Sequence, residues 1–579
     1  MGLYYLTKKE ELHALDLCHS ASIIGIDVET AGKNPLSPQQ SFIRLLQIGT
    51  ESDQFIVDIA ELGMEDSVKA LLMNPNITKI LHSAKFDMKH LLFHYGFYIR
   101  PVFCTFLASR LLSSGNSHHR HSLQAVLKRY LGIEIDKSLQ CSDWAAHLSE
   151  EQIAYAAKDV EYLVPLYQVM SKRLNELKLR KVSQLEFRTI EPVAQMELSG
   201  IRVDRKKLQC TIRETKREMR DIEHELEQML KDDTLLPGFD SINLNSPEQV
   251  KRALEKRGHD LQSTSERELK SIQSKDPAIQ KLLHYRHLHR ILNSTLTSFN
   301  EHILPETGHV HPSYFQIASA SGRFSCSDPN IQQVPREKRI RSLFIPDPGM
   351  LFVIADYSQV ELRVAAGLAE DRIMLEAYAQ GQDLHRLTAS LTSGKPYDQI
   401  SADERQAAKA INFGLIYAMG PKGLQASARQ SYGVNMSIQE AEMFRTNFFK
   451  HYKGIRKWHQ QLEETGKMQK YIRTAAGRIR SYHSESIRIT ELFNVPVQGT
   501  ASEALKAALC LFHKKVNEQN LTACPVAIIH DEIIVQTKKE QAERSRQTLV
   551  ESMVEGASWL VPNVPFEVDA SIARSWADK

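Results

Sequence analysis

The stretch LFVIADYSQVELR, residues 351–363, decides what kind of fold this chain adopts. Its first five residues are apolar, which predicts a buried β-strand that delivers Asp356 at its end. A carboxylate at the end of a buried strand can meet side chains from other strands of the same sheet. A second acid brought to the same place would complete a pair that can bind divalent metal ions.

The second acid comes from the tripeptide HDE, residues 530–532, which lies between apolar runs at 526–529 and 533–535. This pattern predicts a β-hairpin with acidic residues at its tip. Acids in hairpins often serve only the turn, so Asp531 alone carries little weight. Together with Asp356 it can hold two Mg²⁺ ions, one that activates a primer 3′-hydroxyl and one that binds triphosphate oxygens. Nucleotidyl transfer needs little more from the protein.

Between these acids, the sequence RQAAKAINFGLIYAMG, residues 405–420, carries two cations and two aromatic side chains at steps of four. The spacing predicts one stripe along a helix, formed by Arg405, Lys409, Phe413 and Tyr417. The cations would meet phosphates and the aromatic rings would meet bases. Taken alone, the pattern also fits a helix with solvated cations and buried aromatic rings.

These three blocks closely resemble motifs A, B and C of the family A (DNA polymerase I-like) DNA polymerases. Further similarity runs from EPVAQMELSGIRVD through INLNSP, SGRFSCSDPNIQQVP and DLHRLTA to NVPVQGTASEALK, over nearly all of residues 186–579. The resemblance implies an α+β right-hand polymerase domain. Its thumb would span about 205–305, its palm about 306–368 and 490–579, and its fingers about 369–489. The amphipathic, highly charged residues 206–230 would form a thumb helix.

The resemblance also implies a role for each matching residue. Asp356 and Asp531 would hold the metal ions, and Glu532 would support them. Nucleotide contacts would come from Arg405, Lys409, Phe413, Tyr417, Glu361, Gln359 and His385. Glu361 would exclude a ribose 2′-hydroxyl, and a phenylalanine rather than a tyrosine at 413 implies poor use of dideoxynucleotides. Primer and template contacts would come from Arg323, Asn494, Gln498 and His530.

Three positions depart from the family pattern. Ala418 replaces the usual glycine after the fingers tyrosine, Thr490 replaces an arginine, and Ala573 replaces a glycine near the C-terminus. Arg488 is a candidate substitute for the missing arginine. These changes concern template handling and fidelity rather than the chemistry.

The first third of the chain alternates short apolar runs with helical stretches, as in an α/β domain. In SIIGIDVET, Asp27 and Glu29 lie two apart at the end of an apolar strand, so both side chains point to one face. Such acidic pairs are also common in turns and helix caps. Asp87 in HSAKFDMKH adds a third carboxylate, and AYAAKD places Tyr155 and Asp159 one helical turn apart.

Four carboxylates can hold two metal ions for phosphodiester hydrolysis, and Tyr155 could position the water. The order D-x-E, D and Y-x-x-x-D resembles the DEDDy exonuclease superfamily, and SDWAAHLSEEQIAYAAKDV is similar to its ribonuclease D branch. The resemblance implies a ribonuclease H-like α/β domain, a mixed sheet flanked by helices, over residues 1–185, with the polymerase domain over 186–579. It also implies 3′→5′ hydrolysis with Asp27, Glu29, Asp87 and Asp159 as metal ligands.

Bulk composition agrees with an ordinary soluble enzyme. The 579 residues are 42% hydrophobic and 25% charged, and the net charge of +3 leaves the class of partner open. Seven scattered cysteines without a C-x-x-C pair argue against a disulfide framework or a zinc site. The N-terminus lacks the apolar segment of a signal peptide, and no apolar run reaches membrane-spanning length. We therefore expect a cytoplasmic monomer without membrane contact, of cellular, viral or organellar origin.

The sequence thus predicts a template-directed DNA polymerase with a proofreading 3′→5′ exonuclease and no preceding 5′-nuclease domain. Its partners would be primer-template DNA and dNTPs, and its cofactor two Mg²⁺ ions per site, with Mn²⁺ as a substitute. A second hypothesis is a ribonuclease D-like exonuclease with a degenerate polymerase half, which the intact Asp356, Lys409 and Asp531 disfavour. A third is a non-catalytic nucleic-acid clamp, in which such carboxylates would be missing.

Overall fold

The computed structural model describes residues 2–116, 118–140, 142–230, 242–482 and 489–579. The chain divides into two units. The first consists of Met1–Ser199, Tyr314–Ser325 and Ala355–Ser571, and the second of Gly200–Ser313, Cys326–Ile354 and Ile572–Lys579. Each unit is thus assembled from three separate segments of the chain.

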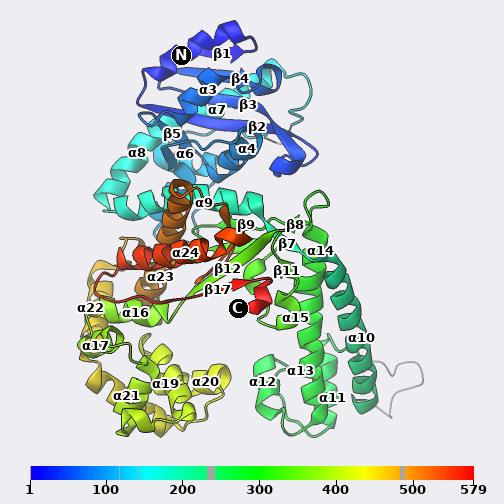
Figure 1. Ribbon diagram of the computed structural model, residues 1–579, viewed down its shortest axis with the longest axis vertical. Coiled ribbons are helices and arrows are strands. Elements are labelled where there is room, and N and C mark those ends of the chain that lie inside the picture. Colours follow the sequence, from blue (N-terminus) through cyan, green and yellow to red (C-terminus); the bar gives the residue numbers. More distant parts are fainter. Residues whose placement is uncertain (1, 117, 141, 231–241, 483–488) are drawn as a thin grey trace. The chain divides into compact units, whose positions relative to one another are not determined.

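A six-stranded sheet lies at the start of the first unit (Figure 1). In the order β1-β4-β3-β2-β5-β6 its strands are Gly2–Leu6, Asp53–Asp58, Ser41–Gly49, Ile23–Gly32, Thr78–Leu81 and Val102–Cys104. β3 is antiparallel to β2 and β4, whereas β1 pairs with β4, β5 with β2 and β6 with β5 in parallel. This is the mixed sheet that the sequence predicted. The sequence predicted Asp27 and Glu29 at the end of a strand. β2 extends to Gly32, however, so both residues lie within it.

Helices accompany this sheet as predicted. They are α1 (Asp16–His19), α2 (Ile59–Leu62), α3 (Asp66–Met73), α4 (Lys85–Tyr95), α5 (Thr105–Leu112), α6 (Leu123–Leu131), α7 (Glu150–Glu161), α8 (Leu163–Glu176) and α9 (Arg180–Ser199). α7 packs directly on β2, β3 and β4. A Cβ atom at Gly49 of β3 would lie 2.7 Å from the Val160 carbonyl oxygen, so glycine lets α7 approach the sheet closely.

A second sheet has the order β15-β16-β12-β17, with strands Ala523–Ile529, Glu532–Lys538, Met350–Tyr357 and Val568–Ala573. β15 and β16 form the predicted antiparallel hairpin, and β12 is the strand predicted from the opening stretch. The long helix α23 (Ile489–Glu518) packs against α24 (Ala542–Ser558) and against α9. Figure 1 shows these helices beside the sheet.

The section between β12 and α23 is helical, as predicted. It comprises α16 (Val360–Leu368), α17 (Arg372–Ala379), α18 (Leu384–Ser393), α19 (Ala402–Leu415), α20 (Pro421–Tyr432), α21 (Ile438–His451) and α22 (Lys453–Gln469), followed by the hairpin of β13 (Tyr471–Arg473) and β14 (Ile479–Ser481). α19 starts with a capping box in which Ser401 and Glu404 bind each other's backbone amides at 3.2 and 2.9 Å. This cap fixes where the helix begins and therefore which side chains it presents.

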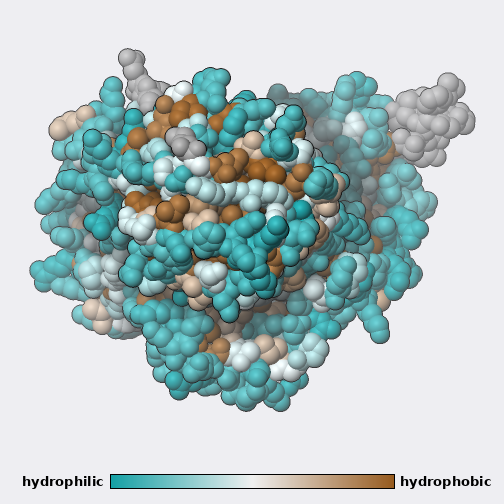
Figure 2. Space-filling model, turned by 90° about the horizontal axis from the view of Figure 1, so that it is seen from above, coloured by the Kyte–Doolittle hydropathy of each residue, from teal (hydrophilic) through white to brown (hydrophobic). Residues whose placement is uncertain are grey.

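The second unit contains the predicted charged helix, α10 (Arg205–Leu230), which packs against α13 (Pro277–Arg290). The buried face of α10 repeats at helical spacing through Leu208, Thr211, Thr215, Met219, Leu226 and Leu230. α11 (Pro247–Lys256), α12 (Glu266–Ile272), α14 (Ser298–His302), α15 (Lys338–Arg341) and a three-stranded sheet of β11 (Phe344–Ile345), β7 (Ile201–Val203) and β8 (His309–Val310) complete the unit. None of the described helices combines the length and the apolar character needed to cross a membrane. Polar side chains cover most of the face of the molecule shown in Figure 2.

Candidate active sites

The first group of acids lies where β2 meets α7. Asp27 and Glu29 alternate along β2, so their side chains lie on the same face of the sheet. α7 begins with a capping box formed by Ser149 and Gln152, which fixes the helix that carries Asp159. Carboxylate oxygens of Asp27, Glu29 and Asp159 all lie within 4.8 Å of one another. The fold thus brings together acids that are more than a hundred residues apart in sequence.

Asp87, on α4, completes what we call the first carboxylate site, Asp27, Glu29, Asp87 and Asp159. The Asp87 side chain is 1% exposed, and burial raises its pKa to about 7. Burial, followed by the charge of Asp87, raises the pKa of Asp27, while burial and Asp159 raise that of Glu29 to about 8. Carboxylates this crowded retain protons unless a cation neutralises them. The site therefore has the ligand chemistry of a divalent metal centre.

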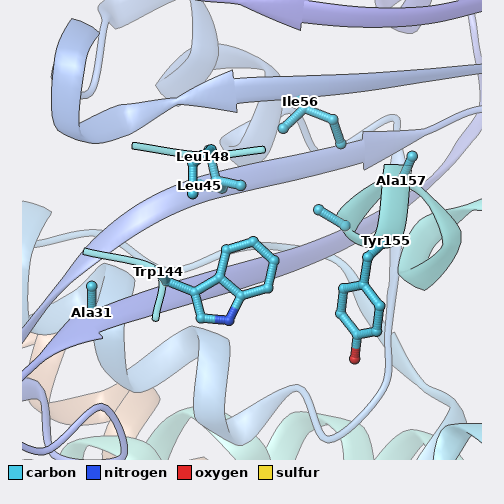
Figure 3. Packing of buried hydrophobic residues seen from close by; sticks show 8 residues of the cluster. Ala31, Leu45, Ile56, Trp144, Leu148, Tyr155 and Ala157 are labelled. Carbon is cyan, nitrogen blue, oxygen red and sulfur yellow. The ribbon is translucent and has the colours of Figure 1, made fainter. Parts of the chain in front are cut away.

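Tyr155 lies one turn before Asp159 and packs against Trp144, with ring centroids 6.0 Å apart. In Figure 3 the tyrosine hydroxyl points away from the apolar cluster that includes Leu45 and Ile56. The hydroxyl is buried and, among the described residues, has no hydrogen-bond partner; the same holds for the Trp144 indole N–H. Burial and then the charge of Asp159 raise the pKa of Tyr155, so the phenol stays protonated and can donate a hydrogen bond.

Lys137 also belongs to this site, although the sequence did not predict it. Its ammonium forms an ion pair with Asp159 and lies 5.1 Å from the centre of the Tyr155 ring. Its charge lowers the pKa of Asp27 and of Glu29, against the effect of burial. Lys137 comes from the segment between α6 and α7, where no periodicity or motif marks it. It supplies a positive charge to an otherwise acidic cluster.

The second group of acids lies where β12 ends. Asp356 is the penultimate residue of β12, and Asp531 occupies the tip of the β15–β16 hairpin, as predicted. β16 is a neighbour of β12 in the sheet, and Asp531 adds to burial in raising the pKa of Tyr357. Asp531 also lines a cavity of about 190 Å³ together with Val360 and Glu361, which follow β12. The hairpin tip and the end of β12 are therefore neighbours in space.

Glu361, in the first turn of α16, is the centre of a polar cluster. It accepts a hydrogen bond from the Tyr417 hydroxyl and another from the Arg323 guanidinium. Burial, followed by the charge of Glu361, raises the pKa of Tyr417, whereas Gln498 lowers it. The structure thus brings together side chains that the sequence assigned to nucleotide contacts, Glu361 and Tyr417, and to primer-template contacts, Arg323 and Gln498.

Tyr417 does not lie on the helix that was predicted to carry it. α19 ends at Leu415, and residues 416–418 form a turn. The chain turns here because Pro421 begins the next helix only a few residues later, and proline cannot continue the preceding one. The predicted stripe of four side chains is therefore a stripe of three.

The three members of that stripe lie near α18. The Arg405 guanidinium is held by Asp383 at 2.7 Å, an acid that the sequence analysis did not single out although it lies in the quoted DLHRLTA. His385 is 2% exposed, and its ring centroid lies 6.1 Å from that of Phe413. Burial lowers the pKa of His385 to about 4, and the charges of Arg405 and Lys409 act in the same direction. His385 is therefore a neutral imidazole at pH 7, which can donate a hydrogen bond but carries no charge.

The remaining predicted residues lie before α16, at the tip of the β15–β16 hairpin, at the start of β16 and on α23. Gln359, before α16, and His530, at the hairpin tip, both have left-handed backbones, with φ of 54° and 59°. This conformation is uncommon outside glycine and is often found at functional sites. Glu532 begins β16 and is 5% exposed. Asn494 and Gln498 lie one turn apart on α23.

The three residues that depart from the family pattern, Ala418, Thr490 and Ala573, lie in different elements of the fold. Ala418 follows α19 with a left-handed φ of 54°, a conformation that favours the glycine it replaces. Thr490 is exposed in the first turn of α23, and Ala573 is buried at the end of β17. Arg488, the candidate substitute for the missing arginine, lies outside the described residues.

Two family models match the chain. Residues 205–578 match the model described as DNA polymerase family A, and residues 5–175 match a 3′-5′ exonuclease model. DNA polymerase I of Aquifex aeolicus is 34% identical over 600 residues, with both chains covered completely. The thermostable DNA polymerase I of Thermus thermophilus is 32% identical over 437 residues, which cover 71% of this chain and 50% of that protein. For DNA polymerase I of Pseudomonas aeruginosa the identity is 29%, over 88% of this chain and 57% of the relative.

A solved structure with the same fold is the POL domain of Pol1 from M. smegmatis, in complex with a DNA primer-template and dNTP. The TM-score is 0.84 at 25% identity, over 100% of this chain and 99% of that one. The fold agrees with the two sheets and the helical section described above. The chain therefore belongs to the family A, DNA polymerase I-like DNA polymerases, and carries a 3′-5′ exonuclease domain.

Proposed function

We propose that the chain extends the 3′ end of a DNA primer at the second group of acids and removes mismatched ends at the first carboxylate site. What carries the proposal is the presence of two separate acidic sites in one chain, each assembled from distant segments. Two sites of this kind, serving one primer strand, allow an incorrectly paired end to be hydrolysed after it frays from the template.

The proposed cofactor is Mg²⁺, two ions at each site, with Mn²⁺ as a substitute. The donor set fits, because carboxylate oxygens are the ligands that Mg²⁺ prefers and those of Asp27, Glu29 and Asp159 lie within 4.8 Å of one another. Asp356 and Asp531 would hold the ions for synthesis. When bound, the ions would activate the attacking oxygen and neutralise charge on the phosphate. Tyr155 would donate a hydrogen bond that holds the attacking water in place.

The incoming nucleotide would lie along α19. Arg405 and Lys409 would neutralise its triphosphate, and the neutral imidazole of His385 would donate a hydrogen bond to a phosphate oxygen. Phe413 would pack against the sugar and base. Glu361 would fill the space of a ribose 2′-hydroxyl, because Arg323 and Tyr417 hold its carboxylate in a fixed position.

Primer-template DNA and dNTPs are the proposed partners, and the M. smegmatis POL domain, which has the same fold, was solved in complex with both. Arg323, Asn494, Gln498 and His530 would contact the minor-groove side of the primer terminus, where acceptors common to all base pairs report correct geometry. We propose that the enzyme works as a monomer in the cytoplasm.

A pair of variants tests the proposal. Asp356→Ala should abolish dNTP incorporation on a primed template and leave degradation of the primer intact, whereas Asp27→Ala should do the reverse. Loss of both activities in either folded variant would show that the sites are not separate. Primer extension by the wild-type protein with Mg²⁺ also distinguishes the proposal from a ribonuclease D-like nuclease whose polymerase half is inactive.

A further inference from the structure

Residues 314–323, which we call the linking segment, begin within the short strand β9 (Ser313–Phe315), end before β10 (Ser325–Ser327) and belong to the first unit. The exonuclease domain holds the beginning of this segment. Lys85 of α4 donates to the Tyr314 carbonyl oxygen at 2.6 Å and pairs with Glu197 at 2.5 Å. Glu197, 3% exposed, also accepts the Tyr314 amide at 2.7 Å. Both backbone groups of Tyr314 are therefore fixed.

The middle of the linking segment is held by Arg110 of α5. Its Nε and Nη2 atoms donate to the Ile317 carbonyl oxygen at 3.1 and 2.5 Å. A guanidinium that donates twice to one carbonyl restrains both the distance and the orientation of that peptide. Arg110 therefore connects the exonuclease domain to the segment a second time.

A buried ion network also holds the linking segment at two points, the carbonyl groups of Gln316 and Gly322. Lys506 of α23 is 0% exposed and donates to Glu186 at 2.5 Å, to the Gln316 carbonyl at 2.7 Å and to the Gly322 carbonyl at 2.8 Å. Arg478 forms a second ion pair with Glu186. A buried ammonium requires such partners, so a shift of one carbonyl draws the ammonium, and with it the other carbonyl, along.

The end of the segment points to the polymerase site. Gly322 has a φ of +74°, and a Cβ atom there would collide with the Arg478 guanidinium. The next residue is Arg323, whose guanidinium binds Glu361. The linking segment is thus restrained by the exonuclease domain at one end and restrains a carboxylate of the nucleotide site at the other.

We propose that Lys85 and Arg110 are positioning residues for nucleotide selection. Through the linking segment they fix Arg323 against Glu361, so the choice between deoxyribose and ribose depends on how the exonuclease domain is docked. A shift of the Ile317 peptide moves the adjoining Gln316 carbonyl, and Lys506, which is bonded to both Gln316 and Gly322, passes the displacement on to Arg323. The inference rests on the proposed role of Glu361 as the barrier to a 2′-hydroxyl.

The test is made in the full chain with Asp27→Asn, so that hydrolysis does not edit the products. We compare Arg110→Met with Arg129→Met, because Arg129 is also half-buried in the exonuclease domain but donates to the Arg120 carbonyl at 2.6 Å and the Ser109 hydroxyl at 3.3 Å, and not to the linking segment. The readout is the ratio of kcat/KM for a dNTP to that for the matching ribonucleotide. Arg110→Met should lower this ratio about tenfold, through a lower KM for the ribonucleotide, and Arg129→Met should leave it unchanged.

Two further variants keep the test decisive. Arg110→Lys retains one donor to Ile317 and should restore most of the ratio, which a general loss of stability would not do. Arg323→Met removes the last contact directly. If Arg323→Met lowers the ratio and a folded Arg110→Met does not, the coupling is wrong. If Arg323→Met itself leaves the ratio unchanged, the contact between Arg323 and Glu361 does not govern selection and the inference fails, whereas an unchanged ratio in Glu361→Ala would overturn the proposed barrier itself.

Discussion

The ammonium of Lys137 is ion-paired with the carboxylate of Asp159, one of three acids whose oxygens lie within 4.8 Å of one another. A divalent ion that bound the same Asp159 oxygen would displace this ammonium. We therefore propose that Lys137 competes with the metal for that oxygen. Such competition lowers the apparent metal affinity without any change in the ligands themselves.

Replacing Lys137 by methionine should raise the affinity for Mn²⁺ about tenfold, because the ion no longer displaces an ion pair of roughly 1.5 kcal/mol. Isothermal titration calorimetry without DNA measures this directly. Lys128→Met is the matched control, since Lys128 pairs with Glu134 at 2.5 Å on the exposed surface. A dissociation constant in Lys137→Met equal to that of the control would show that the lysine does not compete.

Without bound metal, the stability of the folded protein should depend on pH, because Glu29 titrates at different pH values in the folded and unfolded chain. Its pKa is raised to about 8, mainly by burial, so the folded chain retains a proton that the unfolded chain releases at about pH 4.3. The folded state binds more protons over this interval, and stability from this source falls as the pH rises from about 4 to 8. Calorimetric melting in EDTA should show this decline, and Glu29→Gln should flatten it. If the melting temperatures of the wild-type protein and Glu29→Gln differ by a constant amount from about pH 5 to 8, the raised pKa of Glu29 is not the cause of the decline.

The substitution Ala418→Gly should make the protein more stable. The φ of 54° at Ala418 is left-handed, which costs a residue with a Cβ atom about 1 kcal/mol relative to glycine, offset in part by the greater freedom of glycine in the unfolded chain. We expect Ala418→Gly to raise the free energy of unfolding by up to about 1 kcal/mol, measured by urea denaturation. Ala428→Gly, in the middle of α20, is the control and should destabilise the protein. A loss of stability in both variants would exclude backbone strain at Ala418.

Phe413→Tyr should improve the use of dideoxynucleotides. The added hydroxyl at the proposed sugar position can replace the hydrogen bond that a missing 3′-hydroxyl no longer makes, which is worth about tenfold in kcat/KM. Single-nucleotide incorporation of ddNTP and dNTP on the same template gives the ratio. Phe449→Tyr provides a comparison on α21, outside the proposed sugar site, and should leave the ratio unchanged. Equal ratios in both variants would place the sugar elsewhere.

The sequence predicted elements that follow from short-range patterns. The apolar run before Asp356, the hairpin around Asp531 and the α7 spacing of Tyr155 and Asp159 are all confirmed, because each depends only on periodicity within one element. The position of Tyr417 was wrong because the four-residue spacing was extended past the end of α19. Pro421, only a few residues further, was the available signal that the helix had to stop.

Contacts between distant charges could not be predicted in the same way. Lys137 with Asp159 and Arg323 with Glu361 join elements whose approach is set by the packing of the whole unit. Nothing in the sequence around Lys137 distinguishes it from the surface cations, and the resemblance that singled out Arg323 and Glu361 did not pair them with each other. Their partners become visible only when the sheets and helices are in place.

The two units alternate along the chain: the second begins at Gly200, gives way to the first at Tyr314, and resumes at Cys326. One proteolytic cut cannot detach either unit as a continuous fragment, and neither can be gained or lost by joining or truncating genes at a single point. Both sets of acids belong to the first unit. The second unit receives its last residues, Ile572–Lys579, only at the end of the chain. Its folding during translation would therefore be completed only after both sets of acids have been made.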